Sequence, residues 1–268
     1  MSEPDCPVDT HVHLYPCYDV GKFLHAAREQ GPLQCASRVG VLMFSEAAGY
    51  DAFARFASGE ALAGLPGWTV SATQESEAVV LLYEASPALV LVSGWQMNTA
   101  ERLEVLALGT RTRVADGLSL TETLSAVREA GAVPVIPWGF GKWWGVRGRV
   151  LRTWLATHAA ASGVFLGDNG NRPAGFPEPK PMREARAHGM AVLPGSDPLN
   201  LPGHARRPGS YGLRLSGDVS LETPVADLKA ALLSLRPETA VPYGRRLSFP
   251  SFVWANVALR LQKIRRNA

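Results

Sequence analysis

The stretch Pro7-Val8-Asp9-Thr10-His11-Val12-His13-Leu14 joins an apolar strand pattern to two histidines one residue apart. Side chains alternate between the two faces of a strand, so His11 and His13 are expected to point the same way, about 7 Å apart. The β-branched Val8 and Val12 favour a strand, and Tyr15-Pro16 ends it. Two imidazoles on one face can bind a divalent metal ion, with zinc, manganese and iron as the candidates. The alternative is a surface strand with two incidental histidines.

Length and composition bound the class of protein. A chain of 268 residues with 46% hydrophobic content can bury one large core. The net charge of +3 gives no case for a nucleic-acid partner. Cys6, Cys17 and Cys35 are odd in number and make a poor disulfide framework. The first residues show no signal-peptide pattern, and no apolar run approaches the roughly 20 residues of a membrane span. We therefore expect a cytoplasmic protein.

The middle of the chain alternates between short helical and strand patterns. Helices are expected at residues 20–30, 50–57, 120–130, 150–158 and 182–187, and strands at 38–44, 68–72, 78–82, 89–92, 103–108, 133–136, 164–166 and 191–193. The three successive helix–strand units after residue 120 predict parallel strands in a barrel or a doubly wound sheet. Without an internal repeat or linker, residues 1–268 are expected to form a single domain.

Polar residues gather where the apolar strands stop. Besides His11 and His13, these positions hold Glu46, Asp168 and Asp197. A barrel brings successive strand ends to one mouth, and imidazoles with carboxylates there would make a mixed divalent-metal site. These five residues are the candidate metal ligands, with Glu46 and Asp168 also candidate catalytic groups that would act as general base. Each carboxylate has an alternative role as a helix or turn cap.

Basic groups near the same mouth suggest an anionic substrate. The segment Pro137-Trp138-Gly139-Phe140-Gly141-Lys142-Trp143-Trp144-Gly145 is rich in glycine and tryptophan. Lys142 and Arg147, beside the start of the next helix, are candidates to bind a small anion such as a phosphate. His204 and Arg207 lie in a loop just past Asp197 and are further candidates. The alternative is a loop that caps the barrel, with its arginines in solvent.

Several segments together resemble the PHP (polymerase and histidinol phosphatase) family of metal-dependent phosphoesterases. They are Asp9-Thr10-His11-Val12-His13, Gly94-Trp95-Gln96, Leu103-Glu104-Val105-Leu106-Ala107-Leu108-Gly109, Ser119-Leu120-Thr121-Glu122, Arg128-Glu129-Ala130-Gly131-Ala132-Val133-Pro134-Val135 and Gly195-Ser196-Asp197. The resemblance covers roughly residues 7–199 and implies a distorted (β/α)7, TIM-like barrel.

The chain departs from the PHP pattern at several ligand positions. Glu46 stands in place of a Thr-Asp-His motif, and Gln96, Glu104, Trp138 and Leu199 replace expected ligands. His11, His13 and Asp197 remain, so we expect one or two divalent ions rather than three. The resulting hypothesis is a metal-dependent hydrolase acting on a phosphoester or other anionic substrate. The alternatives are an amidohydrolase-like C–N or C–O hydrolase, and a non-catalytic PHP-like binding protein with a degraded metal site.

The C-terminal segment carries a separate pattern. Residues 251–266 place apolar side chains at helical spacing and end in basic residues, which predicts an amphipathic helix. The favoured expectation is that this helix packs on the outside of the barrel. The alternative is that it binds an anionic membrane surface.

Overall fold

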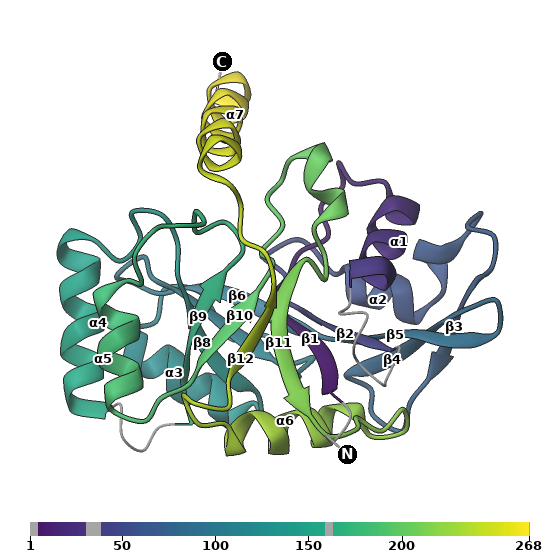
Figure 1. The fold of residues 1–268 in the computed structure, drawn as a ribbon, viewed down its shortest axis with the longest axis horizontal. Helices are drawn as coiled ribbons and strands as arrows, with labels where there is room; N and C mark the ends of the chain where they lie inside the picture. Colours follow the sequence, from purple (N-terminus) through teal and green to yellow (C-terminus); the bar gives the residue numbers. More distant parts are fainter. Residues whose placement is uncertain (1–4, 31–38, 159–162, 268) are drawn as a thin grey trace.

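The computed structural model describes residues 5–30, 39–158 and 163–267, which form two β-sheets flanked by helices (Figure 1). The seven-stranded sheet has the order β12 (Val241–Gly244), β11 (Tyr211–Ser216), β1 (Asp5–Val12), β2 (Gly40–Phe44), β5 (Ser86–Val92), β4 (Ala78–Tyr83), β3 (Trp68–Ala72). The five-stranded sheet has the order β10 (Val192–Gly195), β9 (Phe165–Asn169), β8 (Val133–Pro137), β7 (Glu104–Leu108), β6 (Gly94–Asn98). The helices are α1 (Val20–Gln30), α2 (Ala52–Ala57), α3 (Leu120–Glu129), α4 (Gly145–His158), α5 (Lys180–Ala187), α6 (Pro224–Ser234) and α7 (Phe249–Asn267).

The expected (β/α)7, TIM-like barrel is wrong. A barrel needs strand pairing that closes into a ring. Within the described residues, the pairing between the two sheets is limited to one isolated bridge, Glu46 with Trp95. Many neighbours are also antiparallel: β1 with β11, β11 with β12, β3 with β4, β4 with β5, β6 with β7, and β7 with β8. The expected parallel pairing survives in β8–β9–β10 and in β1–β2–β5.

The two sheets share a core because their strands alternate between an inner and an outer face. On β2, Val41 and Met43 join the core between the sheets, whereas Leu42 and Phe44 pack with α1 and α2. Helices α3, α4 and α5 cover the outer face of the five-stranded sheet. Helix α6 contributes to the core between the sheets and closes its lower end in Figure 1. The polar residues described below lie at the other end.

A β-bulge in β1 decides which way its histidines point. Between the pairs Asp9–Leu42 and Val12–Phe44, β1 has one residue more than β2. As a result, Val8 faces the core between the sheets, whereas Val12, four residues later, packs on the outer side with α1 and α2. The bulge thus reverses the alternation and directs His11 and His13 towards the space between the sheets.

The expected C-terminal helix is present as α7, but it projects away from the sheets (Figure 1). Its first turns contact the rest of the protein through Phe252 against Phe140 and Phe249 against Phe176. Beyond them, Trp254, Val257, Leu261 and Ile264 are exposed. The described contacts of Phe249 and Phe252 thus place the start of the helix against the rest of the protein. None of the described helices is long and apolar enough to cross a membrane.

Candidate metal centre

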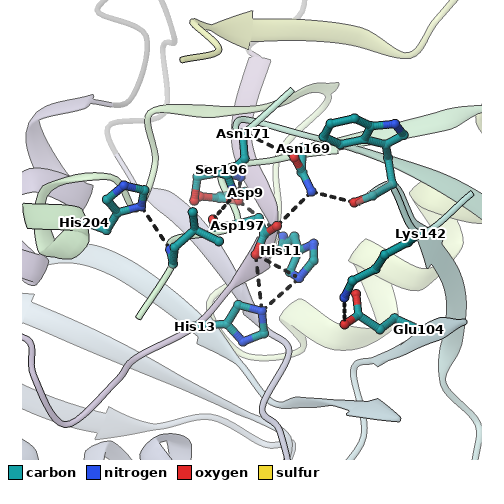
Figure 2. A network of polar contacts seen from close by, with 12 residues as sticks. Asp9, His11, His13, Glu104, Lys142, Asn169, Asn171, Ser196, Asp197 and His204 are labelled. Carbon is teal, nitrogen blue, oxygen red and sulfur yellow. Dashed lines mark hydrogen bonds and ion pairs between the residues drawn. The ribbon is translucent and has the colours of Figure 1, made fainter. Parts of the chain in front are cut away.

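His11, His13 and Asp197 converge where β1 ends and where the chain leaves β10 (Figure 2). The two histidine Nε2 atoms lie 3.0 Å apart. Asp197 Oδ1 lies 3.6 Å from His11 Nε2 and 3.5 Å from His13 Nε2. Both imidazoles are buried, and the aspartate is partly buried. Sequence analysis named all three residues as metal ligands, and the structure brings them together as a group that could hold a metal ion.

The spacing of these three atoms fits a tetrahedral metal ion. With metal–ligand bonds about 2.0–2.2 Å long, neighbouring ligand atoms of a tetrahedral ion lie about 3.3 Å apart. The three separations of 3.0, 3.5 and 3.6 Å are close to this edge length. Two nitrogens and one carboxylate oxygen are also ligands that zinc, manganese and iron accept. Three protein ligands leave a fourth position open for water or substrate.

The histidines are held neutral, which is the state that binds a metal ion. Burial, with the positive charge of Lys142 adding to it, lowers the pKa of His11 to about 3. Burial, together with the neighbouring His11, lowers the pKa of His13 to about 3. The Gln96 side chain opposes this shift at His11, and the Ser45 backbone opposes it at His13, but burial outweighs both.

Asp197 is held in a conformation that side chains rarely adopt. Its φ of 46° lies in the left-handed region, which residues other than glycine, asparagine and aspartate seldom adopt. Asn169 Nδ2 donates to Asp197 Oδ2 at 2.8 Å, and Asn171 Nδ2 donates to the Asp197 carbonyl at 2.6 Å. The backbone N–H of Asp197 donates to the His11 carbonyl at 2.8 Å. These bonds keep Asp197 Oδ1 directed at the histidines.

The close approach of β10 to β1 depends on Gly195. A Cβ at this position would lie 2.5 Å from His11 Cβ and 2.6 Å from His11 N. Asp9, on β1, also holds this region together. Its buried carboxylate accepts from the N–H of Ser196, directly after β10, and from the N–H of Gly209, shortly before β11, each at 2.8 Å. Burial raises the pKa of Asp9 to about 6. Asp9 and Gly195 therefore help to position the three candidate ligands but are not themselves candidate ligands.

Glu46 and Asp168, the other two expected ligands, make different contacts. Glu46 accepts from the N–H of Ala52 at 2.5 Å and of Phe53 at 3.4 Å, and so caps α2. Asp168 accepts from Arg172 at 2.6 and 2.7 Å, and from the Tyr211 hydroxyl at 2.9 Å. Neither carboxylate belongs to the group formed by His11, His13 and Asp197. Their expected catalytic role stays a prediction.

Glu46 should make the stability of the protein fall as pH rises through the weakly acidic range. Burial raises the pKa of its carboxyl to about 7 from a model-peptide value of 4.5. Between these values the folded protein holds a proton that the unfolded chain has lost, so the stabilisation is complete below the lower pKa and disappears above the higher one. The contribution is at most about 3 kcal/mol. The unfolding free energy of the wild type relative to Glu46→Gln should therefore fall between pH 4.5 and 7, as urea titrations of both proteins at several pH values would show. An unchanged pH profile would contradict the assignment.

Three of the four expected substrate-binding residues interact electrostatically with Asp197: Lys142, His204 and Arg207. His204 also accepts from the N–H of Leu199 at 3.0 Å, and burial with the nearby Arg207 lowers its pKa to about 4. Arg147 donates to the Gly141 carbonyl at 2.9 Å within its own loop.

Lys142 and Arg207 place positive charge beside the candidate ligands. Lys142 pairs with Glu104, and burial lowers its pKa (Figure 2). Burial also lowers the pKa of Arg207. Arg207 Nε and one of its terminal NH2 groups are buried without a hydrogen-bond partner in the described part of the chain. That NH2 group lies close to Gly170: a Cβ atom added to Gly170 would be only 2.5 Å from it.

Sequence analysis did not assign a role at the site to Asn169, Asn171, Gln96 or Asp9. On β9, Phe165 faces the core between the sheets and Leu166 the outer side. Strand alternation therefore directs Asn169 inward and Asp168 outward. The alternation of side chains along β9 is therefore the signal that favours Asn169 over Asp168 as the residue at the site. No local pattern marks Asn171, which contacts the backbone of a distant loop.

Comparisons with known proteins give distant structural similarity. No protein-family model matches the chain, and no curated protein matches it by sequence. PsfC from Pseudomonas syringae PB-5123 has a similar structure, with a TM-score of 0.59 and 17% identity over 98% of this chain and 100% of PsfC. The lesion-specific endonuclease PfuEndoQ from Pyrococcus furiosus gives a TM-score of 0.50 and 12% identity over 85% of this chain and 56% of PfuEndoQ. Endonuclease Q bound to a 27-mer duplex with an abasic lesion gives 0.50 and 10%, over 91% of this chain and 60% of the other. This chain therefore shares its fold with these proteins.

Proposed function

We propose that this protein is a metal-dependent hydrolase that acts on a phosphoester or a similar anionic substrate. The observation that carries the proposal is the convergence of two neutral, buried imidazoles and one carboxylate at separations that suit a tetrahedral ion. A divalent ion, when bound, supplies a Lewis acid and lowers the pKa of a bound water towards neutrality. His11, His13 and Asp197 would hold it, and Asn169 would keep Asp197 in place.

The charge around the site favours an anionic substrate. Arg207 carries a buried guanidinium with two nitrogens unsatisfied, and such groups are costly unless a partner is present. An oxyanion of the substrate would supply that partner. Lys142, which pairs with Glu104, adds a second positive charge that interacts with Asp197.

The structural neighbours support hydrolysis as the type of reaction and widen the range of substrates. Two of them are structures of an endonuclease, one bound to duplex DNA. The net charge alone had given no reason to expect a nucleic-acid partner. Nucleic-acid phosphodiesters therefore belong among the substrates to be tested, beside small phosphomonoesters.

Replacing Arg207 should weaken anion binding and strengthen the fold. Arg207→Met removes an unsatisfied buried charge, so the free energy of unfolding should rise by about 1–2 kcal/mol. Inhibition by inorganic phosphate should weaken tenfold or more, because a hydrogen bond to a charged group is lost. Arg206→Met is the control, since Arg206 is the adjacent and exposed arginine. A destabilised Arg207→Met variant with unchanged phosphate inhibition would contradict this role.

A substrate panel tests the proposed function. The protein is stripped of metal, reloaded separately with Mn²⁺, Zn²⁺ or Fe²⁺, and assayed against a chromogenic phosphomonoester, a phosphodiester, an oligonucleotide duplex and an amide. We expect phosphoester hydrolysis that needs the metal and is lost in His13→Ala. Faster turnover of the amide would favour an amidohydrolase. Metal uptake without turnover of any compound would favour a binding protein.

A further inference from the structure

A cavity lies near the candidate metal centre and is linked to it through Trp138. The loops that follow β8 and β9, with Arg152 of α4 and the first residues of α5, enclose about 490 Å³. Pockets for small molecules commonly have volumes of about 300–1,000 Å³. Trp138 connects the two places: its side chain lines the cavity, and its carbonyl accepts from Asn169, which holds Asp197.

The walls of the cavity are aromatic. Trp138 and Trp143 are buried, with 8% and 5% of their surfaces exposed. Phe140, Trp144 and Phe176 also line the cavity and are 44%, 62% and 40% exposed. Exposing large aromatic side chains in one place is unfavourable unless a partner covers them. The Trp143 Nε1–H is buried and, among the residues that the structure describes, has no hydrogen-bond partner.

The same cavity is positively charged. Arg152, Arg172, Lys180 and Arg183 line it, against the single acid Glu178. Glu178 pairs with Arg186, Arg172 with Asp168, and Lys180 with Glu184. Arg152 has no ion-pair partner within the described part of the chain and is exposed. Arg152 is therefore available to a ligand's anionic group.

From the aromatic walls and this free positive charge, we infer that the cavity binds a planar aromatic ring that carries an anionic group, as a nucleoside monophosphate does. Stacking on Trp144 accounts for the exposed indole, and Arg152 neutralises the anion. Stacking of a base on an aromatic side chain contributes about 1–3 kcal/mol. This binding does not depend on the proposed hydrolase function, because it uses none of His11, His13 or Asp197.

Calorimetric titration of the full-length protein tests the inference with defined probes. AMP, UMP and 1-naphthyl phosphate combine a ring with an anion, adenosine has the ring alone, and ribose 5-phosphate has the anion alone. We expect at least one combined probe to bind ten times more tightly than both partial probes. Trp144→Ala should weaken that binding about tenfold. Arg152→Gln should weaken AMP binding without affecting adenosine.

Matched variants separate this cavity from other surfaces. Trp254 on α7 is as exposed as Trp144, at 61% against 62%, and Trp254→Ala should leave binding unchanged. Arg149 is an exposed arginine on α4 that does not line the cavity, so Arg149→Gln is the control for Arg152. Asp197→Asn should retain the affinity within about twofold even if it abolishes hydrolysis. Equal binding of ribose 5-phosphate and AMP, binding that Trp144→Ala leaves intact, or no binding of any combined probe would overturn the inference.

Discussion

Asp197→Asn is expected to abolish metal binding while the protein stays folded. Asparagine tolerates the left-handed conformation of this position better than aspartate does, so the backbone at φ 46° should be preserved. The new amide oxygen can still accept from Asn169 Nδ2. Its NH2 group then faces the two histidine Nε2 atoms, where a cation needs an acceptor. The loss of affinity should exceed the roughly 10–100-fold that removal of an outer partner of a metal ligand costs.

Metal content and thermal unfolding, measured on the same samples, check this prediction. The bound metal should fall to the background level, hydrolysis should fall with it, and the melting temperature of metal-free protein should be unchanged or slightly higher. Asp218→Asn is the control, because Asp218 is an exposed aspartate outside the group. Full metal content in Asp197→Asn would mean that Asp197 only shapes its loop.

Asp168→Ala is expected to destabilise the protein strongly and to leave metal binding intact. The variant would leave the Arg172 guanidinium, whose side chain is 7% exposed, without its bidentate partner. Breaking a buried ion pair from one side costs about 3–5 kcal/mol. That is a large part of the roughly 5–15 kcal/mol that stabilises a typical domain. The Tyr211 hydroxyl would also lose its acceptor.

Urea unfolding of Asp168→Ala, with metal analysis of the folded protein, separates two roles for Asp168. The double variant Asp168→Leu/Arg172→Met should recover part of the lost free energy, because it removes both charges together. If Asp168→Ala instead lost its metal with little change in unfolding free energy, Asp168 would be the metal ligand that the sequence pattern suggested.

Several helices and strands of the fold were predictable because their signals are local. Residues 20–30 and 120–130 show helical spacing and stop at glycine or near it, and α1 and α3 occupy these segments. The barrel was not predictable in the same way. Strand periodicity does not reveal the direction of pairing, and β6, β11 and β12 were not expected as strands. These strands pair antiparallel, and the described strands form two separate sheets without a closed ring of pairing.

The candidate site was predictable where two short motifs carried it. His11 and His13 lie one residue apart, and Asp197 follows a glycine that β1 approaches closely. The choice between Asp168 and Asn169 depended instead on strand parity, which favours Asn169. The bulge in β1 that turns the histidines inward has no sequence signature. Glu46 caps α2 and Asp168 pairs with Arg172, and both partners lie within a few residues along the chain. The sequence alone could not separate these short-range roles from metal binding at a strand end.

Anomalous X-ray diffraction from crystals soaked in Mn²⁺ or Zn²⁺ tests the central claim most directly. We predict one strong peak about 2.0–2.2 Å from His11 Nε2, His13 Nε2 and Asp197 Oδ1, and the loss of that peak in Asp197→Asn. A map without a peak between these three side chains, or with the ion bound at Glu46 or Asp168 instead, would contradict the assignment of the metal centre.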